Sequence, residues 1–135
     1  MSTIQSGGCA CRSVRYKFNS IPTRTINCHC RDCQRSSGAA LATVTCIAKE
    51  DFLISGTTSF YSYTGDSGKP AIRYFCPTCG NPIYSELKSK PSFVFIRIAS
   101  LDSPEIFTPS MQIYMSSALP WVCHQEELEM FERYP

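Results

Sequence analysis

Hydrophobic and polar side chains alternate in several short segments of the chain. In residues 13–18, polar residues separate Val14, Tyr16 and Phe18. Successive side chains of a strand point to opposite faces, so this two-residue period predicts a strand with one buried face. Runs of β-branched, small and aromatic residues predict further strands at 41–47, 60–63, 71–75, 93–98 and 111–114. The polar loop 64–70 between two of these segments predicts a β-hairpin.

Helix signals are few. Residues 32–37 predict one short helical turn, and residues 125–133 predict a C-terminal helix because Leu128 and Phe131 stand three positions apart. Nine prolines suit many short strands and loops. The prediction is a mainly β fold of short antiparallel strands with little helix, in a single domain over residues 1–135.

The composition limits the binding partners and the cellular compartment that we expect. Hydrophobic residues make up 43% of the 135, which is enough for a core, and the net charge of +2 is too weak to indicate nucleic acid. No segment approaches the roughly 20 apolar residues of a membrane span, and residues 1–8 lack the apolar run of an export signal. We therefore expect a cytoplasmic protein with no membrane or nucleic-acid partner.

The nine cysteines are an odd number, and most of them lie in tight clusters. A secreted disulfide framework favours an even number and needs an export signal. Reduced thiolates that bind a metal explain the pattern better, and zinc is the metal typical of such clusters. The clusters are Cys9–Cys11, Cys28–Cys33 and Cys76–Cys79, whereas Cys46 and Cys123 stand alone.

The Cys76-Pro77-Thr78-Cys79-Gly80 segment is the strongest local signal. Two thiolates at this spacing converge on one ion, and Gly80 can adopt the positive φ that reverses the chain around it. A redox dithiol would instead precede a helix in an alternating βα chain. A hairpin precedes this motif and Asn81-Pro82 follows it, which favours metal binding.

The remaining clusters suggest a division of ligands. Cys9 and Cys11 face the same side of an extended segment, and they complete a four-thiolate structural zinc site with Cys76 and Cys79. The trio Cys28, Cys30 and Cys33 would hold a second zinc with one open position, as catalytic sites do. Spacing alone leaves a further possibility, because the trio plus one outside cysteine would also close a site.

Several residues resemble the glutathione-dependent formaldehyde-activating enzyme family, whose domain is shared with centromere protein V. The matching motifs, in chain order, are GGCACRSVRY from Gly7, CHCRDCQRSSG from Cys28, FCPTCGNPIY from Phe75, ASLD from Ala99 and IYMSSALPW from Ile113. The resemblance implies a tent-like β fold, with its core at about residues 5–122. It assigns Cys9, Cys11, Cys76 and Cys79 to the structural zinc and Cys28, Cys30 and Cys33 to the catalytic zinc.

The resemblance also implies the chemistry. Founding members of this family are associated with the addition of glutathione to formaldehyde, and the family is classed among the carbon-sulfur lyases. Three thiolates lower the Lewis acidity of the zinc, so a water bound to it is only weakly acidified. A thiol binds such an ion well as a thiolate, and a substrate thiol is therefore the expected fourth ligand. We therefore expect two zinc ions per chain and a substrate pair of a small thiol, such as glutathione, and a small aldehyde. One alternative is a non-catalytic zinc-binding interaction module with two closed sites, in which Cys46 or Cys123 supplies the ligand that the trio lacks. The other is a protein that only buffers zinc or thiols.

Other side chains receive secondary roles. His29 should face away from the thiolates and make an ordinary hydrogen bond. Asp32 should cap a turn or remain solvated, while Arg31 and Arg35 should balance the thiolate charge or bind a substrate carboxylate. We expect Trp121 to pack, Cys46 to be inert and Cys123 to be exposed. The aromatics expected in the core are Tyr61, Tyr63, Tyr74, Phe75, Tyr84, Phe93 and Phe95.

Overall fold

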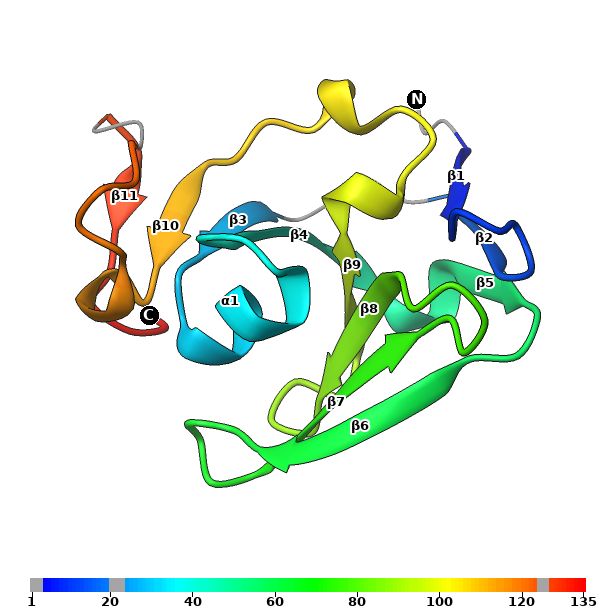
Figure 1. The fold of residues 1–135 in the computed structure, drawn as a ribbon, viewed down its shortest axis with the longest axis horizontal. Helices are drawn as coiled ribbons and strands as arrows, with labels where there is room; N and C mark the ends of the chain where they lie inside the picture. Colours follow the sequence, from blue (N-terminus) through cyan, green and yellow to red (C-terminus); the bar gives the residue numbers. More distant parts are fainter. Residues whose placement is uncertain (1–3, 20–23, 124–126) are drawn as a thin grey trace.

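The computed structural model describes residues 4–19, 24–123 and 127–135. Two sheets make up the fold (Figure 1). The smaller sheet has the spatial order β1 (Gln5–Gly8), β2 (Arg15–Phe18) and β5 (Phe52–Ser55). The larger sheet has the order β11 (Glu129–Met130), β10 (Met111–Ile113), β3 (Arg24–Cys28), β4 (Ala42–Ala48), β9 (Phe93–Arg97), β8 (Pro82–Leu87), β7 (Pro70–Phe75) and β6 (Ser59–Thr64).

Helices are short in the described part of the chain. The single α-helix there is α1 (Arg31–Ser37), which ends at Gly38 with a φ of 67°. The 3₁₀ turns are η1 (Lys49–Asp51), η2 (Ile98–Ser100), η3 (Pro104–Ile106) and η4 (Met115–Ser117). The prediction of a mainly β fold with little helix is confirmed. None of the helices described is long and apolar enough to cross a membrane.

Most of the predicted strands are present. The predicted hairpin is formed by β6 and β7, which pair antiparallel with Tyr63 opposite Ala71. In the larger sheet, neighbouring strands pair antiparallel from β3 through β4, β9, β8 and β7 to β6. Strand β10 instead pairs parallel with both β3 and β11. The expectation of antiparallel strands alone is therefore wrong at this edge. A long connection separates β3 from β10, which permits a parallel pair that no tight turn could make.

The predicted C-terminal helix is also wrong. Residues 125 and 126 lie outside the described residues, and the rest of the predicted helix contains β11. The backbone N–H of Phe131 donates to the carbonyl of Gln112 at 2.9 Å, and the Phe131 ring packs against Ile26, Cys28 and Ile113. The exposed edge of β10 thus offers this segment backbone partners and an apolar contact, and both override a weak helical pattern.

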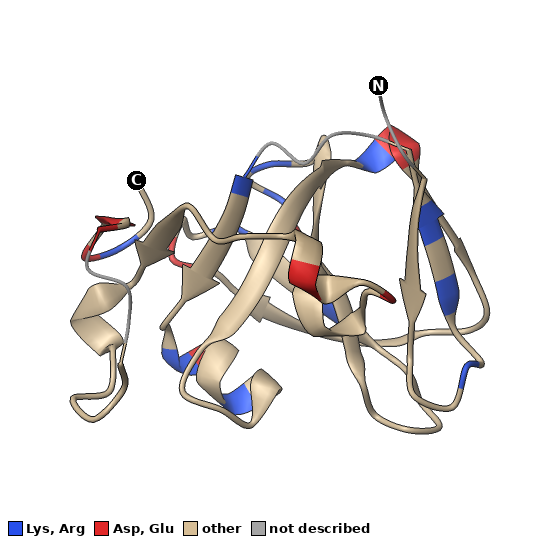
Figure 2. Ribbon diagram, turned by 90° about the horizontal axis from the view of Figure 1, so that it is seen from above, with Lys and Arg blue, Asp and Glu red and all other residues tan. Residues whose placement is uncertain are grey.

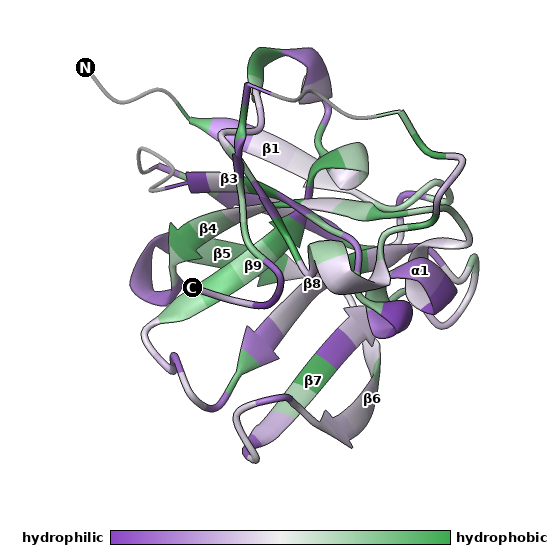
Figure 3. Ribbon diagram, turned by 90° about the vertical axis from the view of Figure 1, so that its left-hand side faces the viewer, coloured by the Kyte–Doolittle hydropathy of each residue, from purple (hydrophilic) through white to green (hydrophobic). Residues whose placement is uncertain are grey.

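The larger core cluster lies between the two sheets. Val14, Tyr16 and Phe18 are buried as the alternating pattern predicts, and they pack with Ile47 and Ile96 of the larger sheet. Figure 3 shows hydrophobic positions concentrated in β4, β5 and β9. The packing positions the loop after β1 beside the turn after β7, and these two connections carry four of the cysteines.

Some expected core aromatics are exposed. Tyr61 is 57% exposed on β6, the edge strand of the larger sheet, and Phe60 beside it is 62% exposed. Trp121 is 71% exposed, so the expectation that it packs is wrong. The side chains of β6 have a neighbouring strand on one side only, which leaves the rings of Phe60 and Tyr61 uncovered.

Two glycines allow a matched test of the backbone. Gly56, in the turn between β5 and β6, has a φ of 92°, and a Cβ there would lie 2.0 Å from the Ser13 carbonyl oxygen. Gly68 has a φ of 83° with open space around it. We expect Gly56→Ala to lower the free energy of unfolding by more than ~2 kcal/mol, and Gly68→Ala by ~1 kcal/mol, because only the first adds a clash to the left-handed strain. Urea unfolding measures both, and equal losses would contradict the clash.

Candidate metal centres

The first thiol cluster joins two loops that are distant in the sequence. Cys9 and Cys11 follow β1, and Cys76 and Cys79 lie in the turn between β7 and β8. All four Sγ atoms lie within 4.8 Å of one another. The Cys11 sulfur is 3.6 Å from the sulfurs of Cys9 and Cys76. Tetrahedral zinc with bonds of ~2.3 Å separates its sulfurs by ~3.8 Å, so this donor set fits the ion.

Backbone N–H groups point at these sulfurs. The N–H of Val14 donates to Cys9 Sγ at 3.3 Å, and those of Thr78 and Cys79 donate to Cys76 Sγ at 3.3 and 3.4 Å. The hydroxyl of Ser13, followed by these N–H groups, lowers the pKa of Cys76 to about 5. Donors of this kind stabilise thiolates, which are the form that binds metal.

Turn geometry brings the two loops together. Gly80 has the positive φ, 78°, that the motif requires, and Arg12 takes the same left-handed conformation at 66° in the other loop. The side chain of Asn81 accepts from the backbone N–H of Ala10 at 2.7 Å, which links the loops directly. The convergence of Cys9, Cys11, Cys76 and Cys79 therefore agrees with the spacing argument.

The second cluster lies where β3 meets α1. Cys28 ends β3, Cys30 caps the helix and Cys33 lies in its first turn. Their three Sγ atoms lie within 4.8 Å of one another. The Cys30 sulfur accepts from the N–H of Cys33 at 3.3 Å. Hydrogen bonds from Cys28 and Cys33 and from the backbone lower the pKa of Cys30 to about 3, while donation to Cys30 raises that of Cys28.

Neither isolated cysteine joins this trio. Cys46 is buried in β4 and Cys123 is exposed, and among the described residues neither belongs to a group of converging metal ligands. The closed site that an interaction module would need is therefore not formed by these two residues. The expectations for the burial of both cysteines agree with the structure.

His29 directly follows β3, and its side chain contacts β10. Its side chain is fully buried, and its Nε2 lies 2.7 Å from Gln112 Oε1. Gln34 Nε2 donates to the carbonyls of His29 and Ser117 at 2.8 and 3.0 Å, which ties α1 to the residue after β3 and to η4. The ordinary hydrogen-bonding role predicted for His29 agrees with this geometry. Gln34 and Gln112 were not predicted, because no local spacing marks a long-range amide contact.

The trio opens into a cavity of about 700 Å³. Among the residues that the structure describes, six basic side chains line it and two acidic ones, Asp32 and Asp66. The basic residues are Arg31, Lys69, Arg73, Lys90, Arg97 and Arg133. Arg31 thus lines the cavity, as the predicted roles in charge balance or carboxylate binding require. Arg35 is exposed and lies outside the cavity lining. Elsewhere basic and acidic positions are interspersed along the ribbon (Figure 2).

Arg97 and Arg73 are the cations that the sequence did not reveal as site residues. Arg97 is only 6% exposed and donates from Nη2 to Ser36 Oγ at 2.6 Å. No carboxylate in the described ranges pairs with it. A buried guanidinium needs compensating negative charge, and the thiolates of the trio can supply it. Arg73 donates to the Asp32 carbonyl at 3.1 Å and lies 5.1 Å from the Tyr63 ring centre.

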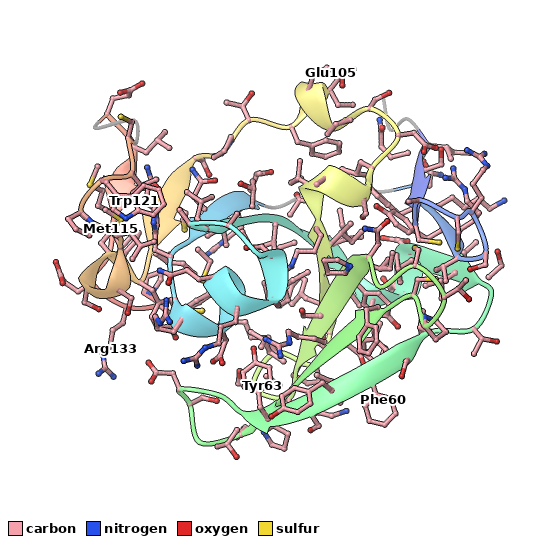
Figure 4. The ribbon with its side chains drawn as sticks, in the orientation of Figure 1. Phe60, Tyr63, Glu105, Met115, Trp121 and Arg133 are labelled. Carbon is pink, nitrogen blue, oxygen red and sulfur yellow. The ribbon has the colours of Figure 1, made fainter. Side chains whose placement is uncertain are left out.

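Tyr63 belongs to the cavity rather than to the core. Its side chain lies on the side of β6 that faces α1 (Figure 4), and it lines the same cavity as the trio. Burial, followed by the charges of Cys33 and Asp32, raises its pKa to about 12. The hydroxyl is therefore neutral near pH 7 and available as a hydrogen-bond donor.

Fold and sites together define a small β protein with two thiol clusters that can each hold a metal ion. The family described as glutathione-dependent formaldehyde-activating enzyme matches residues 4–117, and the chain belongs to this family. Its chemistry is accordingly related to glutathione and formaldehyde.

The fold also resembles a solved structure. A crystal structure of a Rhodobacter sphaeroides protein, from a structural genomics programme, is similar with a TM-score of 0.57 and 18% sequence identity. The similarity covers 93% of this chain and 98% of the other, and at this identity it shows the fold alone. A comparison with curated protein sequences finds no match.

Removing one ligand tests the four-cysteine cluster. We expect Cys76→Ser to remove about one zinc per chain and to lower the free energy of unfolding by several kcal/mol in zinc-containing buffer, because a structural zinc contributes ~10 kcal/mol or more of binding energy. Cys123→Ser is the control, since Cys123 is exposed and outside both clusters. Metal content and chemical unfolding with and without a chelator measure the effect. A Cys76→Ser protein with wild-type zinc content would contradict a ligand role.

Proposed function

We propose that this protein is a zinc-dependent carbon-sulfur lyase acting on thiol adducts of small carbonyl compounds, with chemistry like that of S-hydroxymethylglutathione. The observation that carries the proposal is the trio of Cys28, Cys30 and Cys33, whose sulfurs converge at the wall of a cationic cavity. Three ligands and an open cavity are typical of a catalytic zinc, whereas the four-cysteine cluster suits a structural one.

The trio would hold the catalytic ion, and Cys9, Cys11, Cys76 and Cys79 the structural ion. Bound zinc would favour the deprotonated form of a thiol at its open position and would orient the sulfur. The β3–α1 junction supplies the sulfurs from a short segment, so the geometry of the trio depends on the Gln34 bridges to His29 and Ser117. The buried Arg97 offsets the negative charge that three thiolates and a fourth sulfur bring together.

The reaction that this site supports is reversible addition. In the forward direction the thiol sulfur bonds to the carbonyl carbon, the π electrons move to the carbonyl oxygen, and this oxygen gains the proton lost by the thiol. The product is a hemithioacetal, and the reverse direction breaks the same carbon–sulfur bond. Tyr63 is the neutral hydroxyl placed in the cavity to hydrogen-bond the oxygen as negative charge develops on it.

The basic lining favours an anionic thiol. Among the described lining residues, six cations against two carboxylates favour a positive field in the cavity, and glutathione carries carboxylates. A small aldehyde such as formaldehyde needs no pocket of its own beside the sulfur. Glutathione and formaldehyde are therefore the first substrates to test.

The test uses Cys30→Ser with Cys123→Ser as its control. We expect Cys30→Ser to lose the zinc of the trio, to keep the other zinc and to lower the rate of adduct formation at least ~100-fold, because the open position no longer exists. Exchange NMR follows glutathione and formaldehyde against their uncatalysed rate, and elemental analysis counts zinc. Full zinc content together with wild-type rates in Cys30→Ser would overturn the proposal.

A further inference from the structure

The C-terminal segment forms part of the cavity wall. After β11, the backbone N–H and the hydroxyl of Ser116 both donate to the Glu132 carbonyl, at 3.3 and 2.8 Å. These bonds hold the next two residues, Arg133 and Tyr134, in the lining of the three-cysteine cavity. The family match ends at residue 117, so this part of the wall lies outside the matched region.

One carboxylate from the opposite side of the cavity meets this segment. Asp66 lies in the loop between β6 and β7, and its Oδ2 accepts from the Tyr114 hydroxyl at 3.3 Å and from Arg133 Nη1 at 3.4 Å. Arg133 projects beside the tip of this hairpin in Figure 4. A guanidinium and a phenol hydroxyl directed at one oxygen form a receptor for a carboxylate.

The internal carboxylate is weakly held. The side chain of Arg133 is 73% exposed and that of Asp66 is 47% exposed, and both contacts are longer than an ideal charged hydrogen bond. Exposed pairs of this kind contribute ~1 kcal/mol or less to stability. A carboxylate from solution can therefore replace Asp66 at little cost.

The backbone at Tyr114 is an independent sign of a built site. Tyr114 has φ 58° and ψ 42°, the left-handed conformation that disfavours a bulky side chain. Such strain of ~1–2 kcal/mol persists where the surrounding structure requires it, and it gathers at ligand sites. The conformation leads from β10 into η4 and places the phenol in the cavity lining, within reach of Asp66.

We propose that Tyr114 and Arg133 form a carboxylate-binding subsite in the wall of the three-cysteine cavity, and that Asp66 fills it until a carboxylate of the ligand takes its place. The ligand class follows: a thiol that also bears a carboxylate, with the sulfur at the trio and the carboxylate at the C-terminal segment. This ligand class rests on the proposed function, whereas the exchange of carboxylates does not. Arg133 is then a residue that determines specificity, supplied by the segment beyond the family match.

The experiment compares two thiols of similar size on the zinc-loaded full chain by calorimetry. 3-Mercaptopropionate carries a carboxylate and 2-mercaptoethanol does not. We expect Asp66→Asn to tighten 3-mercaptopropionate about fivefold, the factor that ~1 kcal/mol supplies, because it removes the internal competitor. Binding of 2-mercaptoethanol should stay unchanged. Arg133→Gln should abolish the preference for 3-mercaptopropionate.

Two variants control for charge. Asp32→Asn removes a carboxylate from the same cavity that neither Tyr114 nor Arg133 contacts, and Arg35→Gln removes a cation that lies outside the lining. Equal tightening by Asp66→Asn and Asp32→Asn would show a general field effect and overturn the subsite. Equal losses from Arg133→Gln and Arg35→Gln would overturn it too.

Propionate separates this proposal from the lyase assignment. If neither thiol binds the wild-type protein, the proposed function fails. The subsite is then judged by propionate alone, followed through NMR shifts of the Tyr114 ring, which both variants below retain. Binding to Asp66→Asn but not to Asp66→Asn/Arg133→Gln supports the subsite, and equal behaviour of these two variants overturns it.

Discussion

Repulsion between gathered thiolates is the constraint on which this structure depends. Like charges so close disfavour one another, so four sulfurs within 4.8 Å cannot all be ionised unless a cation lies among them. The four-cysteine cluster also joins the loop after β1 of the small sheet to the turn after β7 of the large one. A metal there would satisfy the charge and connect the two sheets with one set of bonds. The apolar contacts of Tyr16 and Phe18 with the larger sheet support the same junction without fixing the loops.

The trio meets the same constraint in a different way. Its sulfurs come from one continuous segment, so no distant loop completes a closed shell. The buried Arg97 and the N–H groups at the start of α1 moderate the negative charge from the protein side. The amide of Gln34 holds the backbone of this segment at the His29 carbonyl, and the amide of Gln112 holds the His29 ring. The trio is thus held by hydrogen bonds on one side and borders the cavity on the other, as a site that accepts a further sulfur requires.

Sequence patterns predicted those features of the structure that depend on residues close together in the chain. The alternation around Tyr16, the hairpin of β6 and β7, and the convergence of closely spaced cysteines follow from strand geometry and from the reach of a tight turn. Contacts between distant segments escaped prediction because no spacing records them. Asp66 meets Arg133 only through the fold, and β11 formed instead of a helix because the edge of β10 was available. The exposure of Trp121 likewise depends on which neighbours the fold provides.

The contact between Cys11 and Cys76 spans 65 positions of the sequence. Closing a loop of that length carries a conformational entropy cost, and contacts of long range form late when a chain folds. The free energy of binding an ion at this junction would offset that cost, because the unfolded chain does not hold the four thiolates together. During synthesis the ligand set stays incomplete until Cys79 emerges, so the supply of metal to the newborn chain would set when the two sheets can dock.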